Sequence, residues 1–252
     1  MRPQARRSLG QHFLVDDNVL RVIERLAELD RDDVVLEVGP GLGVLTRFLA
    51  ERVTHVHAVE LDRRLASHLE GIEHTTVHWG DAMRLDVSRL EPPPHKLVAN
   101  LPYNIATPLV AESLTVDQLT GWCVMVQREV ADRFFARPST KAYGSVSVLV
   151  QLASERTGFH PVSREVFRPR PNVDSALVAF RRIAAGLDPV VKLLVEAAFA
   201  HRRKTLANSL ALTGTVSRER AVAALVGMGR SAAARAEELD PPEFVALARE
   251  LA

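Results

Sequence analysis

Between residues 34 and 126 the chain alternates short β-rich runs with segments whose apolar residues recur at helical spacing. The alternation is typical of βαβ units, which build a parallel sheet. Several runs are almost entirely apolar, as strands covered on both faces should be. The pattern predicts an α/β fold with a mostly parallel sheet and strands at Val34–Val38, His55–Leu61, Thr75–His78, Lys96–Leu101 and Trp122–Val126.

The pattern changes near residue 185. A last strand is predicted at Ala176–Phe180, and Arg181–Leu187 reads as a linker because it contains Gly186 and is followed by Pro189. Beyond it the spacing is helical at Val190–Ala200, Arg203–Leu212, Glu219–Val226 and Phe244–Leu251. We therefore predict a large α/β domain over residues 1–185 and a small all-helical domain over residues 186–252.

Several classes of protein are disfavoured by the composition. Cys123 is the only cysteine, which excludes an intramolecular disulfide and a cysteine-based zinc site. His55 and His57 share a strand face but lack a third ligand at suitable spacing, so no metal is predicted. No apolar run approaches the roughly 18 residues of a membrane span. The basic N-terminus leads into no apolar stretch, so we expect a cytoplasmic protein without a membrane partner.

A glycine-rich turn, Glu37–Gly43, follows the first predicted strand. Its Gly-x-Gly-x-Gly spacing, through Gly39 and Gly41, differs from that of dinucleotide-binding loops. Glu60 ends the next strand, about 20 residues on, where a carboxylate can accept both hydroxyls of a ribose. Asp81 follows the third strand and is suited to bind an adenine amino group. Each signal alone also fits an ordinary strand end, but their order predicts a site for a nucleoside cofactor without phosphates.

Asn100-Leu101-Pro102-Tyr103 follows the fourth strand, at the sheet edge where α/β folds bind ligands. The exocyclic amine of adenine is a poor nucleophile because its lone pair is delocalised into the ring. The side-chain oxygen of Asn100 and a backbone carbonyl around Leu101–Pro102 can accept both amine hydrogens and so direct the lone pair at a methyl donor. Tyr103 can stack on the base. The alternative is a proline turn without a catalytic role.

These segments occur together with five others in one known family. The chain resembles the small-subunit rRNA adenine N6-dimethyltransferases, the kasugamycin-resistance methylases, through nearly its whole length. The resemblance rests on the segments Leu9–Leu14, Val126–Ala131, Tyr143–Val148, Phe167–Ser175 and His201–Leu206.

The resemblance implies a Rossmann-like, seven-stranded methyltransferase domain that uses S-adenosylmethionine. It implies that His12 and Leu14 contribute to the cofactor pocket, although the family usually has asparagine where this chain has His12. It further implies that the target adenine lies between Tyr103 and Phe167. The expected product is a pair of adjacent dimethylated adenosines near the 3′ end of small-subunit rRNA, formed while the subunit assembles.

The net charge of +1 says little about a nucleic-acid partner, so clustering of basic residues has to carry that argument. We expect an assembling small subunit to be the partner of a monomeric enzyme. The hypothesis is that reversing the charges of Arg202 and Arg203 weakens RNA binding without altering cofactor affinity. The candidate phosphate contacts are Arg6, Arg7, Arg168, Arg170, Arg202, Arg203 and Lys204.

Two other functions remain open at this point. The macrolide-resistance methylases modify a large-subunit rRNA adenine and usually carry Asn-Ile-Pro-Tyr in place of residues 100–103. A ribosome-assembly factor could keep the fold and lose catalysis, but it would have no use for the combination of Glu60, Asp81, Asn100 and Tyr103.

Overall fold

The computed structural model describes residue 6, residues 10–184 and residues 186–251. Its contacts divide the chain into two compact units. The first unit comprises Met1–Ala131 and Glu155–Arg182, and the second comprises Asp132–Ser154 and Ile183–Ala252. The predicted boundary at residue 185 lies near the last crossing between the units. Residues 132–154, however, group with the C-terminal helices rather than with the sheet.

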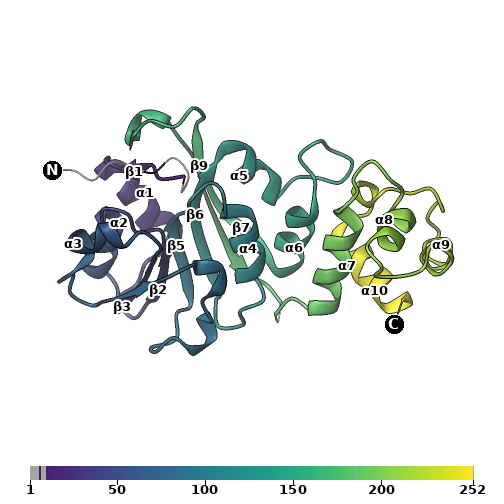
Figure 1. Cartoon of the computed structure of the whole chain (residues 1–252), viewed down its shortest axis with the longest axis horizontal. Helices are drawn as coiled ribbons and strands as arrows, with labels where there is room; N and C mark the ends of the chain where they lie inside the picture. The colour runs from purple at the N-terminus through teal and green to yellow at the C-terminus, as the bar shows by residue number, and fades with distance from the viewer. Residues whose placement is uncertain (1–5, 7–9, 185, 252) are drawn as a thin grey trace. The chain divides into compact units, whose positions relative to one another are not determined.

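A seven-stranded sheet forms the first unit (Figure 1). Neighbouring strands from β4 to β6 are parallel, whereas β9 is antiparallel to β6. The fold class predicted from the sequence, an α/β fold with a mostly parallel seven-stranded sheet, is confirmed. In spatial order the strands are β4 (Thr75–Trp79), β3 (His55–Glu60), β2 (Val34–Val38), β5 (Lys96–Asn100), β6 (Gly121–Gln127), β9 (Ser175–Arg182) and β7 (Ser154–Val162).

Three strands have no counterpart in the sequence prediction. β7 is the edge strand, and its mostly polar, partly exposed residues give no apolar run. The two-residue strands β1 (Phe13–Leu14) and β8 (Phe167–Arg168) pair with each other in antiparallel register, with Leu14 opposite Phe167. Such short strands depend on a partner about 150 residues away, so local periodicity cannot reveal them.

Helices cover both faces of this sheet. On one face α1 (Asp17–Ala27) and α2 (Val44–Ala50) share a core with β-strand residues. On the other face α4 (Ala106–Ser113) lies against β6, where the Trp122 indole donates a hydrogen bond to the Ser113 hydroxyl over 2.9 Å. Two further helices that begin in this unit are α3 (Ala66–Leu69) and α5 (Arg128–Phe134).

The same alternation that builds the core brings polar residues to one edge. Val35, Val56 and Val98 face the core under α1 and α2. Because strand side chains alternate, Glu37, Glu60 and Asn100 lie on that same face, at the carboxyl ends of β2, β3 and β5. The chain runs outward from β2 to β4 and then returns to β5, so the strand order reverses between β2 and β5. Ligands bind at such a switch point in open α/β sheets.

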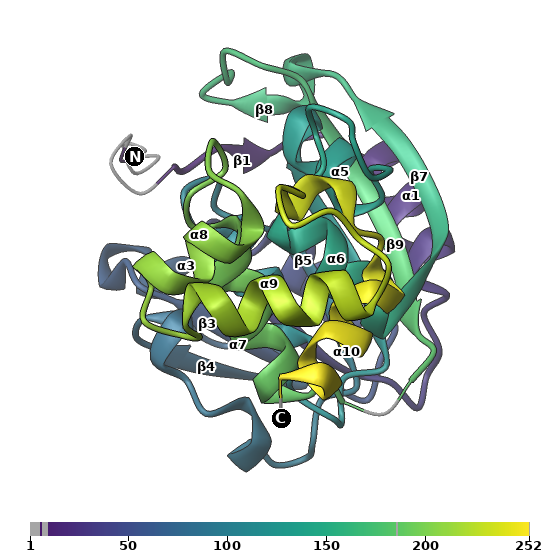
Figure 2. The same ribbon diagram turned by 90° about the vertical axis from the view of Figure 1, so that its right-hand side faces the viewer.

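The second unit is helical (Figure 2). Tyr143 is fully buried in it, and its hydroxyl donates to the Leu239 carbonyl over 2.9 Å. α6 packs against α7 and α10, which is why residues 132–154 join this unit. No helix in the described part of the chain is long and apolar enough to cross a membrane. The helices are α6 (Ser145–Ala153), α7 (Pro189–Phe199), α8 (Leu206–Leu212), α9 (Arg218–Gly227) and α10 (Pro241–Glu250).

Candidate active site

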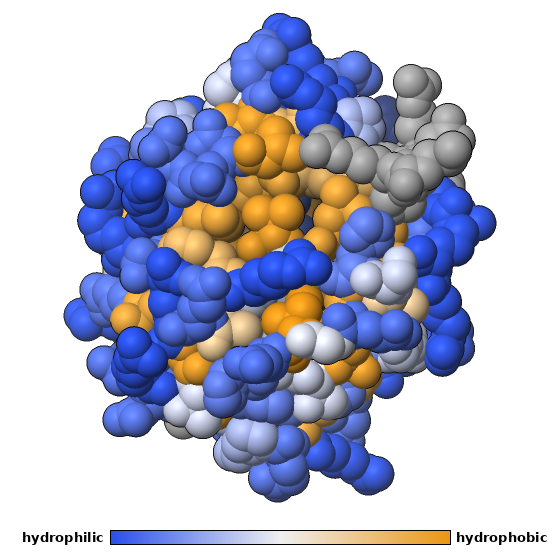
Figure 3. Space-filling model, turned by 90° about the vertical axis from the view of Figure 1, so that its left-hand side faces the viewer, coloured by the Kyte–Doolittle hydropathy of each residue, from blue (hydrophilic) through white to orange (hydrophobic). Residues whose placement is uncertain are grey.

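A cavity of about 260 Å³ opens at the carboxyl edge of the sheet, and Figure 3 shows apolar side chains gathered around a hollow on this side of the first unit. Its walls come from residues 10–14, the glycine loop with the start of α2, the ends of β3 and β4, and residues 100–105. The cavity therefore brings together His12, Leu14, Gly39, Gly41, Glu60, Asp81, Asn100, Leu101, Pro102 and Tyr103, all of them predicted site residues.

The glycine loop fits tightly between two other walls of the cavity. Gly39 and Gly41 have φ angles of 75° and 59°, which side chains rarely adopt. A Cβ atom on Gly39 would lie 3.0 Å from Pro102 Cγ, and one on Gly41 would lie 2.9 Å from Phe13 Cδ1. Both positions therefore require glycine, for conformation and for space.

Glu60 is buried, and its two carboxylate oxygens accept separate backbone hydrogen bonds. Oε2 accepts from the Gly41 amide over 3.1 Å and Oε1 from the Asp62 amide over 2.8 Å. Burial raises the pKa of Glu60, while these backbone donors oppose the shift. Each oxygen keeps a further lone pair, so the carboxylate can still accept two hydroxyl groups of a ribose.

Asp81 lies two residues beyond β4 and lines the cavity at its exposed end. Its Oδ1 accepts from the Met83 amide over 2.9 Å and caps the 3₁₀ turn Ala82–Arg84. The cap fixes the carboxylate, and Oδ2 has only a distant Arg84 guanidinium, at 4.0 Å. Asp81 thus retains an acceptor for an amino group.

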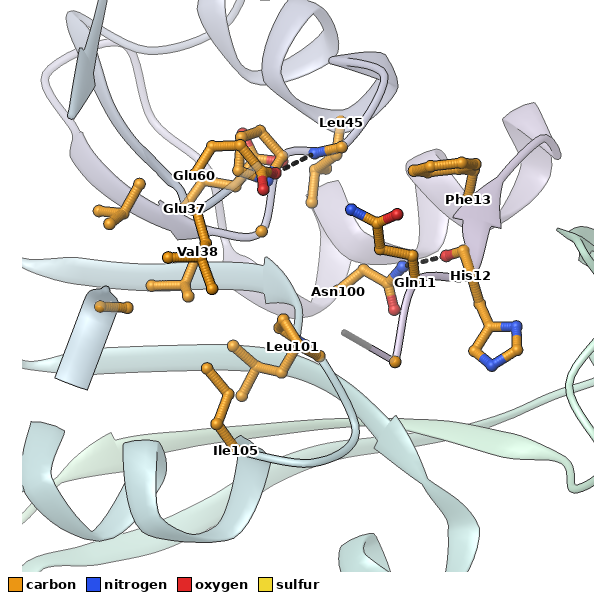
Figure 4. A pocket seen from close by; sticks show the side chains of 18 of the residues that line it. Gln11, His12, Phe13, Glu37, Val38, Leu45, Glu60, Asn100, Leu101 and Ile105 are labelled. Atoms are coloured by element: carbon orange, nitrogen blue, oxygen red, sulfur yellow. Dashed lines mark hydrogen bonds between the residues drawn. The ribbon is translucent and has the colours of Figure 1, made fainter. Parts of the chain in front are cut away.

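Asn100 has a defined orientation. Its Nδ2 donates to the His12 backbone carbonyl over 3.0 Å (Figure 4). A carbonyl only accepts, so the amide cannot be flipped and Oδ1 must be the free acceptor. Pro102 O already accepts the Ile105 amide over 3.1 Å, which makes the Leu101 carbonyl the better candidate for a second acceptor.

Tyr103 is half-buried, and its hydroxyl lies 2.6 Å from the Ser175 hydroxyl. Burial raises the pKa of the phenol. The His12 ring lies against Tyr103, with centroids 5.2 Å apart and planes tilted by 32°. Figure 4 shows this imidazole turned away from Glu60. His12 thus meets the cavity through its backbone, and the imidazole contacts Tyr103 instead.

The position of Phe167 differs from the prediction that its ring stacks on the target adenine. Its side chain is fully buried in the core under α1 and α2, and the ring does not line the cavity. In β8 its neighbour Arg168 is exposed, so strand alternation turns the phenylalanine inward, opposite Leu14. In this conformation it cannot stack on a base.

Glu37 also lines the cavity, although the sequence predicted only that the loop carrying it suits a nucleoside without phosphates. It is fully buried, and its Oε2 has no hydrogen-bond partner among the described residues. Burial raises its pKa to about 8, an effect that Thr46 opposes and the charge of Glu60 reinforces. The signal was present in the sequence: Glu37 shares the core face of a buried strand with Val35.

The residues around the cavity fit S-adenosylmethionine. Three carboxyl groups line it, from Glu37, Glu60 and Asp81, and its described walls contain no lysine or arginine. That set suits a cationic nucleoside and is unsuited to a phosphate. The unpartnered Oε2 of Glu37 supplies an acceptor that the protein itself does not satisfy.

The predicted phosphate contacts differ in what they already bind. Arg202 donates to the Tyr143 carbonyl over 2.9 Å and pairs with Glu237. Arg168 donates to two carbonyls of its own loop, and Arg170 pairs with Glu165 over 2.8 Å. Arg203 and Lys204 are exposed, with no side-chain partner among the described residues. Arg6 is exposed too, and Arg7 lies outside the described residues.

Solved structures share the fold of this chain, which is that of the Rossmann-like methyltransferases that use S-adenosylmethionine. A dimethyladenosine transferase from Plasmodium falciparum superposes with a TM-score of 0.74 at 25% identity, covering 94% of this chain and 96% of that one. The 23S rRNA methyltransferase ErmE superposes with a TM-score of 0.61 at 30% identity, covering 95% and 99%.

Sequence relatives narrow the class. Ribosomal RNA small subunit methyltransferase A from Rubrobacter xylanophilus is 48% identical over 99% of this chain and 96% of its own length. The protein of the same name from Moorella thermoacetica is 40% identical over 98% and 92%. A family model described as ribosomal RNA adenine dimethylase matches residues 2–245, so the chain belongs to the ribosomal RNA adenine dimethylase family.

Proposed function

We propose that this protein uses S-adenosylmethionine to dimethylate the N6 amines of two adjacent adenosines near the 3′ end of small-subunit rRNA. One observation carries the proposal. Asn100 is fixed by the His12 carbonyl, so that its Oδ1 is free as an acceptor beside Tyr103 in the cavity. The names of the relatives from Rubrobacter and Moorella support the small subunit as substrate.

The residues of the loop activate the amine by orientation. Asn100 Oδ1 and the Leu101 carbonyl accept the two amine hydrogens, which favours a pyramidal nitrogen with an available lone pair. Tyr103 stacks on the base and holds its plane. When bound, the cofactor supplies an electrophilic methyl group on a cationic sulfur. The methylated amine loses its proton readily, so no general base is needed before attack.

The other cavity residues hold the cofactor. Glu60 accepts the ribose hydroxyls and Asp81 the adenine amino group, while Glu37 offers a buried carboxyl oxygen that has no partner among the described residues. The glycine loop allows close approach of the backbone, and Leu14 and His12 contribute to the wall opposite it.

Gly41→Ala is expected to weaken the binding of S-adenosylhomocysteine about tenfold, because a crowded side chain costs about 1–3 kcal/mol. The added Cβ meets Phe13 as well as adopting a strained φ. Isothermal titration calorimetry measures the affinity. Gly71→Ala is the matched control, since its φ is 75° but no atom lies within 4 Å of the added Cβ. Equal affinities in the two variants would contradict the tight fit of the loop.

We further propose that the second unit extends the RNA-binding surface. The proposed substrate is an assembling small subunit in the cytoplasm, and the enzyme acts as a monomer. Arg203 and Lys204 supply the phosphate contacts there. Arg202 has a structural share as well, through Tyr143 and Glu237. Reversing its charge would confound binding with folding, so the test of this surface uses its two neighbours.

Arg203→Glu with Lys204→Glu is expected to weaken binding to small-subunit particles and to reduce the slope of log affinity against log salt by about two, roughly one per lost phosphate contact. Affinity for S-adenosylhomocysteine should not change. Filter binding over a salt series measures the slope. The control is Arg21→Glu with Arg25→Glu on the exposed side of α1. An unaltered slope in the first variant would refute the contact.

The reaction itself is tested with labelled S-adenosylmethionine and small subunits from a strain lacking the modification, with large-subunit rRNA as competitor. We expect the label in N6,N6-dimethyladenosine of the small-subunit RNA. Label in the large-subunit RNA would instead assign the function that the name of the ErmE structure carries. Tight particle binding without any label would mean a non-catalytic assembly factor.

A further inference from the structure

His12 contacts three parts of the proposed site. Its backbone carbonyl accepts from Asn100 Nδ2 over 3.0 Å. Its ring lies against Tyr103, and its Nδ1 lies 2.8 Å from the Pro169 carbonyl. These partners come from the end of β5, from the segment that follows it and from the loop after β8, which lies far from both in the sequence.

The hydrogen bond to the Pro169 carbonyl shows that the His12 ring carries a hydrogen on Nδ1. Because a carbonyl only accepts, Nδ1 must carry the hydrogen. The ring is thus anchored at one nitrogen and packed along Tyr103. The tyrosine is anchored at its other end by the Ser175 hydroxyl, 2.6 Å from the phenol oxygen. His12 and Ser175 together hold the Tyr103 ring in place.

The spacing of the two rings decides where a base can lie. Centroids 5.2 Å apart are typical of two rings in direct contact, so there is no room for an adenine between His12 and Tyr103. Phe167 is buried, so its ring has no exposed face on which a base could stack. The imidazole therefore supports Tyr103 from one side, and the base takes the other face of the tyrosine.

We propose that His12 is a positioning residue. Its ring holds Tyr103 in the orientation that stacks on the target adenine, and this support affects the rate of the second methyl transfer more than that of the first. The proposal rests on the proposed function. In the first transfer the base is held by two amine hydrogens, at Asn100 Oδ1 and the Leu101 carbonyl. After it, only one amine hydrogen remains, so stacking on Tyr103 accounts for a larger share of the orientation.

The test compares His12→Ala, which removes the ring, with His12→Phe, which keeps a ring but loses the Nδ1 donor. His160→Ala on β7 is the control, a half-buried histidine outside the cavity. Small subunits lacking the modification are the substrate. The readouts are KM and kcat for the particles, the ratio of N6-monomethyl- to N6,N6-dimethyladenosine by mass spectrometry, and the S-adenosylhomocysteine Kd by calorimetry.

For His12→Ala we expect KM for the particles to rise about two- to tenfold, the range that the loss of one aromatic contact implies. We also expect monomethyladenosine to accumulate while the S-adenosylhomocysteine Kd stays at the wild-type value. His12→Phe should restore most of the dimethylated product.

An unchanged product ratio and KM in His12→Ala would overturn the proposal. So would a weaker S-adenosylhomocysteine Kd with equal slowing of both transfers, because that pattern belongs to the cofactor wall. Wild-type protein that forms dimethyladenosine separates either result from a failure of the proposed function, which would abolish the product in every variant.

Discussion

Asn100→Ala is expected to slow methyl transfer by about two to three orders of magnitude, the usual effect of removing one group that stabilises a transition state electrostatically. The variant loses the acceptor for one amine hydrogen, so the nitrogen lone pair is no longer directed at the methyl group. It also leaves the His12 carbonyl without the donor that it has at 3.0 Å. Single-turnover measurements with labelled cofactor give the rate of transfer.

Two further variants make this result specific. Asn100→Asp keeps an oxygen in place but cannot donate to the His12 carbonyl, so it should lose at least about tenfold in rate. Asn18→Ala, on the exposed side of α1, should match the wild-type rate. If Asn100→Ala retained the wild-type rate, the orientation mechanism would be wrong, whatever the affinity for the cofactor.

Glu37→Gln is expected to stabilise the ligand-free protein, and to do so increasingly as the pH rises from 5 to 9. The pKa of Glu37 is about 8 in the folded chain, against 4.5 as the ordinary value. Between these values the folded protein keeps a proton that the unfolded chain releases, so the free energy of unfolding falls as pH rises. At 1.36 kcal/mol per pH unit the loss reaches at most about 5 kcal/mol above pH 8.

Glutamine is neutral at every pH and avoids this loss. The midpoint of thermal unfolding should therefore differ little between variant and wild type near pH 5. It should be higher in the variant by roughly 10 °C at pH 9, since 1 kcal/mol corresponds to about 2–4 °C in a chain of this size. Glu70→Gln, an exposed carboxylate, is the control. A constant difference between Glu37→Gln and wild type across the pH range would show that Glu37 does not titrate as described.

The cofactor side of the cavity could be predicted from sequence because its geometry follows from topology. Glu60, Asp81 and Asn100 each end or follow a parallel strand, and such ends share one edge of a sheet. Glu37 was predicted only as part of a loop suited to a nucleoside, because the sequence does not show that one of its oxygens lacks a partner. Its alternation with Val35 was legible but says nothing about the partners of its oxygens.

The base side depends on pairings that sequence patterns do not encode. Phe167 was expected beside the base, yet a two-residue strand opposite Leu14 turns it inward. His12 was expected to contribute to the cofactor pocket without a defined contact for its side chain, and the structure places its ring against Tyr103 and Pro169. Both orientations are set by contacts between segments more than 90 residues apart in the chain. Local periodicity carries no information at that range.

The assignment of Asp132–Ser154 to the second unit means that the backbone passes between the two units three times, after Ala131, Ser154 and Arg182. The second unit is therefore not a C-terminal module that can be trimmed or transplanted. Truncation at residue 185 would expose to solvent the apolar residues of α6 that pack on α7 and α10. A chimera that takes its second unit from a relative has to replace two segments together, and a graft of the C-terminal helices alone should yield insoluble protein.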